Sequence, residues 1–252
     1  MKNKIIILLF FSHASLFALE KPPNSLFEKG NTFYNKGDYQ NAIESYLGII
    51  ENGYHSSEVY YNLGNANYKI GNVAEANFYF EKANMLSPND KMIMNNLEFA
   101  KNMTMDSIET LPKTQINLFF NDLLAFMTTD NWSILSVLII WMGCILFLIY
   151  SFSKSIVIKR IFFSSGVLSF LIFALFIYIT FSKQEQENTK KGIIFSKEIG
   201  VWTEPNQRTE VLFFLHEGTK FEIIDELEGW SKILISNGSE GWIESNSIRL
   251  LN

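Results

Sequence analysis

Few side chains in this chain could carry covalent or metal chemistry. Its 252 residues include one cysteine, Cys144, and three histidines, His13, His55 and His216, which are far apart in the sequence. A thiolate nucleophile needs a base beside it, and a zinc site needs three or four such ligands. We therefore predict a protein that is not an enzyme and that needs no metal or cofactor. His55 and His216 are expected to be solvated.

The charge balance excludes a further class of function. The net charge is −5, and a nucleic-acid partner is not expected because nucleic-acid-binding proteins need a basic face. A single cysteine also rules out a disulfide within the chain. Three parts of the chain have distinct sequence patterns: a repeat, a pair of apolar runs, and a series of short apolar segments separated by turn signals.

Residues 23–103 contain an internal repeat. Three pairs of small residues recur at a spacing of 34: Gly30 and Gly64, Gly37 and Gly71, and Ala42 and Ala76. Small residues let paired helices approach closely, and glycine suits the turn between them. A helix–turn–helix period of 34 residues resembles the tetratricopeptide repeat. The resemblance implies two all-α repeats, over 23–56 and 57–90, and a capping helix over 89–103.

The resemblance also implies a concave groove that binds peptides or protein segments. Asparagine amides in such a groove can bracket a peptide backbone. In a well-known variant, basic residues grip a terminal carboxylate, but Phe27, Met92 and Asn96 occupy those positions here, so we expect a more apolar ligand. The alternative is that these residues form a solvated or packed face. The implied groove residues are Phe27, Asn31, Tyr34, Tyr61, Asn62, Asn65, Tyr68, Lys69 and Phe99.

Two later segments, Trp132–Phe152 and Ile161–Phe181, carry no charged residue. Each is long enough, as a helix, to cross a hydrocarbon core of about 30 Å. The connection between them, 153–160, has three basic residues and no acid, which predicts that it stays in the cytoplasm. We therefore expect a two-helix transmembrane hairpin; a pair of buried core helices is the alternative. Without acids or bases inside the bilayer, transport is not expected.

The first residues have the layout of a secretory signal peptide, 1–18. Lys2 and Lys4 precede a short apolar run, and cleavage is expected after Ala14 or Ala18. An uncleaved anchor is the alternative. With the hairpin, this layout predicts a two-pass protein of the bacterial inner (cytoplasmic) membrane, with both terminal domains on the periplasmic, exported side.

Residues 104–131 connect the repeats to the hairpin. The first part is polar and reads as a linker, and Ile116–Met127 has apolar residues at spacings of three and four. That helix is too short to span a membrane, so we expect it to lie in the interface or to pack on the hairpin. Gly143 and Cys144 on the first membrane helix, and the pair Ser165 and Ser169 on the second, are candidates for close helix approach.

After residue 185, short apolar runs alternate with turn signals. The segments Glu217–Lys220, Gly229–Ile233 and Gly241–Ile243 resemble those of bacterial SH3-like domains. The resemblance implies an all-β small barrel over 186–252 that binds cell-wall peptides or protein segments. Its ligand surface would include Trp202, Trp230 and Trp242; the alternative is that Trp230 and Trp242 are mainly core.

The order of signal peptide, repeats, hairpin and SH3-like domain resembles the BatE-like tetratricopeptide proteins of bacterial aerotolerance operons. Proteins of that family accompany von Willebrand A-domain membrane proteins and a MoxR-type ATPase. The resemblance implies a multi-domain membrane protein that acts as a scaffold in an inner-membrane complex linked to envelope stress, in contact with protein partners and the lipid bilayer. The alternative is a cell-wall tether or sensor whose SH3-like domain binds peptidoglycan.

Overall fold

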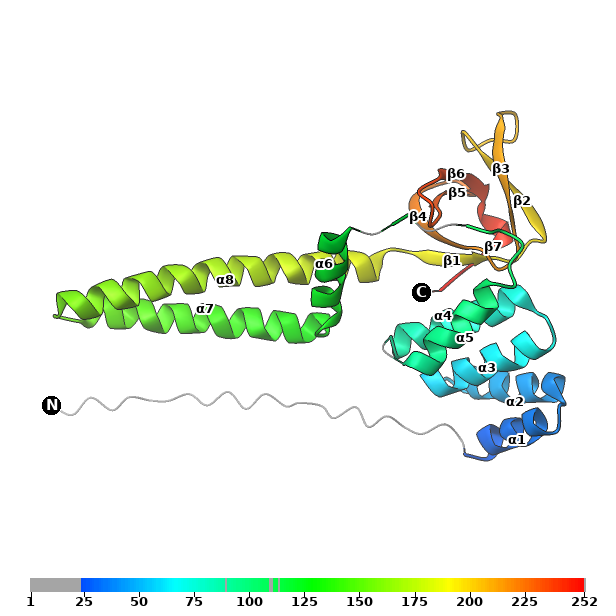
Figure 1. Cartoon of the computed structure of the whole chain (residues 1–252), viewed down its shortest axis with the longest axis horizontal. Coiled ribbons are helices and arrows are strands. Elements are labelled where there is room, and N and C mark those ends of the chain that lie inside the picture. The colour runs from blue at the N-terminus through cyan, green and yellow to red at the C-terminus, as the bar shows by residue number, and fades with distance from the viewer. Residues whose placement is uncertain (1–23, 89, 109–110, 113, 252) are drawn as a thin grey trace. The chain divides into compact units, whose positions relative to one another are not determined.

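The computed structural model describes residues 24–88, 90–108, 111–112 and 114–251 (Figure 1). The predicted signal peptide, 1–18, lies outside the described residues. The chain divides into two compact units, Met1–Lys101 and Asn102–Asn252, and each is described by itself.

The first unit is a stack of antiparallel helices in which α1 pairs with α2 and α3 pairs with α4, with α1 lowest and α4 and α5 uppermost in Figure 1. Gly37 and Gly71 close the two turns, each with φ of +79°, a conformation that side chains with a Cβ rarely adopt. Asp38 and Ser56 cap the helices that follow them by accepting a backbone N–H bond. The helices are α1 (Asn24–Asn35), α2 (Tyr39–Glu51), α3 (Ser57–Lys69), α4 (Val73–Leu86) and α5 (Lys91–Lys101).

Glycine sets the distance between the paired helices. A Cβ added to Gly30 would lie 2.4 Å from Cε1 of Tyr46, and one added to Gly64 would lie 2.6 Å from Cδ1 of Phe80. Tyr46 and Phe80 are both fully buried, so each ring fills the space that a glycine leaves on the facing helix. The same pair of contacts therefore occurs in both repeats, 34 residues apart.

The second repeat accommodates a polar residue in its interior. Asn67, which stands where the repeat usually has an aromatic residue, is buried. Its Nδ2 donates to the carbonyl of Leu63 at 2.9 Å, and its Oδ1 accepts a bond from Nδ2 of Asn72 at 3.2 Å. These bonds offset the cost of burying the amide.

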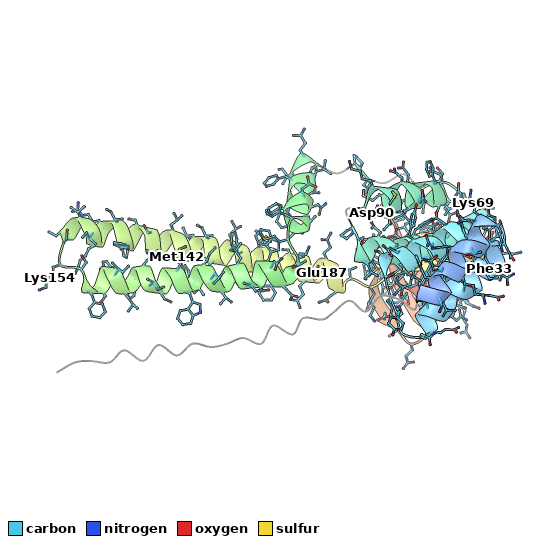
Figure 2. The ribbon with its side chains drawn as sticks, turned by 90° about the horizontal axis from the view of Figure 1, so that it is seen from below. Phe33, Lys69, Asp90, Met142, Lys154 and Glu187 are labelled. Carbon is cyan, nitrogen blue, oxygen red and sulfur yellow. The ribbon has the colours of Figure 1, made fainter. Side chains whose placement is uncertain are left out.

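In the second unit, α7 (Thr129–Phe152) and α8 (Ile156–Asn188) form a hairpin of 24 and 33 residues. Figure 2 shows Lys154 at its turn, Met142 along α7 and Glu187 near the opposite end. Both helices are long and apolar enough to cross a membrane, by length and composition. The non-helical turn is shorter than the predicted loop, 153–160, because Lys159 and Arg160 already belong to the first turns of α8.

Small residues and α6 (Gln115–Ala125) fix the packing of the hairpin. Ser169 is buried, and its Oγ donates to the carbonyl of Ile139 at 2.8 Å. A Cβ added to Gly143 would lie 3.0 Å from Oγ of Ser169. Leu124 of α6 shares a buried cluster with Trp132 and Ile179, so α6 packs on the hairpin.

The last part of the chain is one antiparallel sheet with the strand order β3-β2-β6-β5-β4-β1-β7. The predicted small barrel was wrong in its closure, since no pairing among the described residues joins the end strands β3 and β7. Closure requires the end strands to pair, and β7 has three residues, all engaged on β1. The strands are β1 (Lys191–Ile194), β2 (Glu198–Trp202), β3 (Val211–His216), β4 (Lys220–Leu227), β5 (Trp230–Leu234), β6 (Glu240–Glu244) and β7 (Ile248–Leu250).

The core of this sheet takes in a segment from far upstream. Ile108, in the segment predicted to be a polar linker, packs against the buried cluster that includes Val201, Phe221 and Ile233. The backbone N–H of Leu111 donates to the carbonyl of Ser236 at 3.3 Å. Part of the linker is thus an additional element of the β domain.

Candidate functional site

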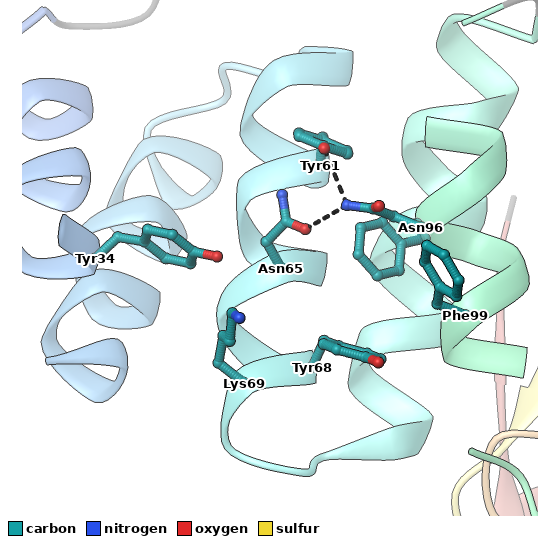
Figure 3. A pocket seen from close by; sticks show the side chains of 8 residues that line it. Tyr34, Tyr61, Asn65, Tyr68, Lys69, Asn96 and Phe99 are labelled. Carbon is teal, nitrogen blue, oxygen red and sulfur yellow. Dashed lines mark hydrogen bonds between the residues drawn. The ribbon is translucent and has the colours of Figure 1, made fainter. Parts of the chain in front are cut away.

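A pocket of about 300 Å³ opens on the helical repeats (Figure 3). This volume lies at the lower end of the range of small-ligand sites, which suits one or two side chains of a peptide. Its wall combines rings, amides and one lysine. The lining residues are Tyr34, Tyr61, Asn65, Tyr68, Lys69, Phe80, Asn96 and Phe99.

One helix face supplies half of this wall. On α3, residues 61, 65, 68 and 69 follow the spacing of four, seven and eight that places side chains on one face of a helix. Tyr34 reaches in from α1 and Phe99 from α5, on opposite sides of α3 in Figure 3. Phe80 of α4 is 1% exposed, so it forms the floor of the pocket.

Hydrogen bonds hold the polar groups of the wall in place. Nδ2 of Asn96 donates to Oδ1 of Asn65 at 2.7 Å and to the hydroxyl of Tyr61 at 2.9 Å, as the dashed lines of Figure 3 show. An amide held in one orientation presents its donor and acceptor at fixed positions, which lowers the entropy cost of binding a peptide backbone.

The charges around the pocket favour an apolar or weakly acidic ligand. Burial raises the pKa of the Tyr34 hydroxyl, with further contributions from Tyr39 and Tyr61, so this hydroxyl stays neutral at physiological pH. Lys69 is exposed at the rim and brings a positive charge. Phe99 is 59% exposed, which leaves a large apolar surface for a ligand to cover.

Six of the nine groove residues implied by the sequence line the pocket, and three do not. Asn31 accepts bonds from the hydroxyl of Tyr46 at 2.8 Å and from Nδ2 of Asn62 at 3.2 Å. The ring of Phe27 lies 6.1 Å from that of Tyr46. Asn31, Asn62 and Phe27 therefore connect the first three helices to one another.

The nine implied groove residues leave out Phe80 and Asn96, although Asn96 was placed at a position that is basic in the carboxylate-gripping variant and the repeat period also contains a signal for it. The bond from Asn62 to Asn31 recurs 34 residues later as the bond from Asn96 to Asn65. We call these four residues the asparagine ladder. Because α5 extends the ladder, it continues the repeat as the first helix of a further copy, and so supplies the far wall of the pocket.

The three tryptophans of the proposed SH3-like surface come from β2, β5 and β6. The rings of Trp202 and Trp230 lie edge to face with centroids 5.3 Å apart, and Trp202 stands opposite Trp242 in the sheet. All three are half-buried. Trp202 packs against the core cluster, whereas Trp230 and Trp242 are not among its buried or packed members.

The two histidines in the described part of the chain differ in their surroundings. His55 is exposed and its Nδ1 lies 2.7 Å from the hydroxyl of Tyr60. His216 was expected to be solvated, and this was wrong: its Nδ1 lies 2.6 Å from Oδ1 of Asp106. A sequence separation of 110 residues hides that contact from any local pattern.

Comparison with known families agrees with this architecture. Residues 23–51 and 57–90 each match a tetratricopeptide repeat family, and residues 200–249 match the bacterial SH3 domain family. No curated protein matches the chain. The chain thus contains tetratricopeptide repeats and a bacterial SH3 domain, which together support a role in protein–protein interaction. Repeats of this kind are typical of non-catalytic interaction proteins.

Proposed function

We propose that this protein is a membrane-anchored, non-catalytic scaffold whose tetratricopeptide pocket binds a peptide segment of a partner. The observation that carries the proposal is the pocket itself, where the asparagine ladder meets exposed rings. Its ligand is a short segment that inserts an apolar or aromatic side chain over Phe80 and Phe99 and places its backbone on Asn65. An acidic group beside that side chain would meet Lys69.

The surface of the hairpin supports the membrane anchor. Large apolar side chains are exposed along both helices, among them Trp141 at 65% and Phe152 at 83%. A soluble protein does not expose apolar surface of this extent, and hydrocarbon would cover it. The turn carries Lys154, with Lys159 and Arg160 just beyond it, which favours a turn in the cytoplasm and both interaction domains on the exported side of the inner membrane.

The physiological setting follows from the resemblance to the BatE-like proteins of aerotolerance operons. On that basis the partners are von Willebrand A-domain membrane proteins that act with a MoxR-type ATPase, in a complex that responds to envelope stress. The turn of the hairpin is short, so a link to a cytoplasmic ATPase would run through the membrane helices of such a partner.

Loss of partner capture tests the pocket. We expect detergent extracts containing the Tyr61→Ala, Tyr68→Ala double variant to recover fewer membrane partners than wild type, because both rings line the pocket. Tyr54→Ala, which removes a half-buried tyrosine outside the pocket, is the matched control. Circular dichroism verifies that helix content is kept. Equal recovery by the double variant and the control would contradict the pocket.

A second candidate function is a cell-wall tether, favoured by the half-exposed Trp202, Trp230 and Trp242. Aromatic faces of this kind stack on sugars and peptides. Sedimentation of the detergent-solubilised chain with purified wall material tests this function. Co-sedimentation that Trp242→Ala abolishes would support it, and a chain that stays in the supernatant would remove it.

A further inference from the structure

A single carboxylate is bound at the turn between β3 and β4. Oδ2 of Asp106 accepts the backbone N–H of His216 at 2.7 Å and the hydroxyl of Thr219 at 2.6 Å, and Oδ1 accepts Nδ1–H of His216 at 2.6 Å. The Asp106 side chain is 12% exposed. Three donors on one desolvated carboxylate are a recognition geometry, because each bond to a charged acceptor is stronger than a neutral one.

Backbone hydrogen bonds that do not involve the carboxylate also hold this turn. The N–H of Ile194 donates to the carbonyl of Thr219 at 3.0 Å, and the N–H of Gly218 donates to the carbonyl of Ile194 at 2.8 Å. Gly218 has φ of +87°, which places the turn in a conformation suited to glycine. The strand β1 therefore holds His216 and Thr219 in the positions from which they donate.

An apolar contact accompanies the carboxylate. Ile108 packs against the core cluster of the β domain, two residues after Asp106, and its N–H closes a bond to the carbonyl of Asp106 at 3.1 Å. Glu222 of β4 stands opposite Leu234 of β5, so the turn before β4 and the turn after β5 lie at the same end of the sheet. The bond from Leu111 to Ser236 lies at that end too.

The charged groups that face His216 come from two elements. Asp106, in the linker, lies beside Nδ1 of His216. Glu198 of β2 stands opposite His216 of β3 in the sheet, and its Oε2 lies 3.6 Å from Nε2 of His216. The bond to Asp106 raises the pKa of His216 above its ordinary 6.5, and Glu198 adds to this, against partial burial. Burial alone would raise the pKa of Asp106, but the bonds from Thr219 and His216 outweigh it and hold the pKa below its ordinary value.

We propose that this end of the SH3-like domain is a peptide-binding site for an aspartate followed two residues later by an apolar side chain, and that its resident ligand is the chain's own linker. Asp106 is the recognised carboxylate and Ile108 the apolar anchor. We call this the aspartate site.

Tethering explains why the site is filled. A ligand attached by a short chain has an effective concentration in the millimolar range, so a free peptide competes poorly with it. The aspartate site lies beyond the end of β5, whereas Trp230 begins that strand. Occupation by the linker therefore leaves the tryptophan surface to bind a different ligand.

Competition in trans tests the proposal on the full chain in detergent. The probe is a labelled peptide of residues 102–108, Asn-Met-Thr-Met-Asp-Ser-Ile, and the receptor is the Asp106→Ala, Ile108→Ser variant, in which the linker loses both contacts. We expect this variant to bind the probe on the order of tenfold or more tightly than wild type. A probe with asparagine in place of its aspartate should lose the gain. Equal binding by wild type and variant, or equal binding of the two probes, would overturn the proposal.

A second measurement guards against a variant that misfolds. In Asp106→Asn, which keeps the shape of the side chain, the pKa of His216 measured by NMR of the imidazole should fall toward its ordinary value. Asp122→Asn, an exposed acid on α6, is the matched control and should leave the pKa of His216 unchanged. An unchanged pKa in Asp106→Asn would show that this carboxylate does not occupy the site.

Discussion

At the scale of single residues, the two repeats solve the same packing problem with the same pair of side chains. Gly30 with Tyr46 and Gly64 with Phe80 bring a ring against the backbone of the facing helix. Phe80 has two roles: its buried ring packs against Gly64 and also forms the floor of the pocket. Stability and binding are therefore coupled at Gly64.

A methyl group at Gly64 tests this contact. Gly64→Ala should destabilise the helical repeats by about 1–3 kcal/mol, because its Cβ would overlap the ring of Phe80, and the strain outweighs the better helix propensity of alanine. Hydrogen exchange in α3 and α4 measures the change.

The control for that substitution is Gly48→Ala on α2, where the nearest side-chain atom would lie 3.8 Å from the new Cβ. This variant should be neutral or stabilised by roughly 0.5–1 kcal/mol, because alanine favours the helix without a clash. Equal destabilisation by both substitutions would show that the facing ring does not set the helix distance.

The linker contact should depend on pH in a direction fixed by its two titrating groups. The raised pKa of His216 gives stability that is complete below 6.5 and lost as the pH rises through the raised value. The lowered pKa of Asp106 gives stability that is complete above 3.8 and lost as the pH falls through the lowered value. The linker should thus be held most firmly between about pH 4 and 6.5.

Fluorescence anisotropy can follow this dependence. A dye on Met105→Cys, a position 76% exposed, in a Cys144→Ser background should report high anisotropy at pH 5–6 and a decline above neutrality. His216→Gln should remove the alkaline decline. An alkaline decline that persists in His216→Gln would assign it to another group.

At the scale of elements, local periodicity predicted most of what the structure contains. The 34-residue period located the helices of both repeats, and the two uncharged runs located α7 and α8. The ends were less well predicted: α8 continues to Asn188, past Phe181, because its last turns are polar and carry no hydrophobic signal. The helix continues there because these residues have good helix propensity and because Nζ of Lys183 donates to the carbonyl of Leu124, at the end of α6.

Contacts between distant segments could not be predicted. Whether the sheet is open or closed depends on which strands pair. The bulge in β4 between Ile223 and Asp225 changes the direction of this strand, which pairs with both β1 and β5. The site of Asp106 joins residues that are 110 apart in sequence. In the pocket, six residues were implied by the resemblance to tetratricopeptide repeats; Phe80 was not among the implied residues, and Asn96 was named only as standing at a position that is basic in the carboxylate-gripping variant.

The hairpin offers a test at this scale. Gly143→Val should weaken the packing of α7 on α8 by about 1–3 kcal/mol, because a Cβ there already approaches Oγ of Ser169 to 3.0 Å. Gly166→Val is the control, since no atom lies within 4 Å of its added Cβ. Thermal unfolding in detergent micelles, followed by circular dichroism, should show a lower midpoint for Gly143→Val. Matching midpoints would contradict the close approach at this position.

At the scale of the whole molecule, the proposed scaffold function requires both interaction domains on one side of a membrane. Fusion reporters that are active on one side test this topology. A cytoplasmic reporter should be active at Ser155, in the turn, and an exported reporter should be active at Asn252. The opposite pattern would place both domains in the cytoplasm and refute the exported orientation, and the same side for both positions would refute the two-pass arrangement.

The proposed function depends on a tetratricopeptide pocket that holds a segment of another protein. Replacing Phe99 by a photo-crosslinking benzoylphenylalanine in intact cells places the reactive group at the rim of the pocket, and the same replacement at exposed Glu44 on α2 places it outside. We expect discrete protein adducts from position 99 that weaken in Tyr61→Ala, Tyr68→Ala and are missing from position 44. The same adducts from both positions, or none from position 99, would contradict the claim.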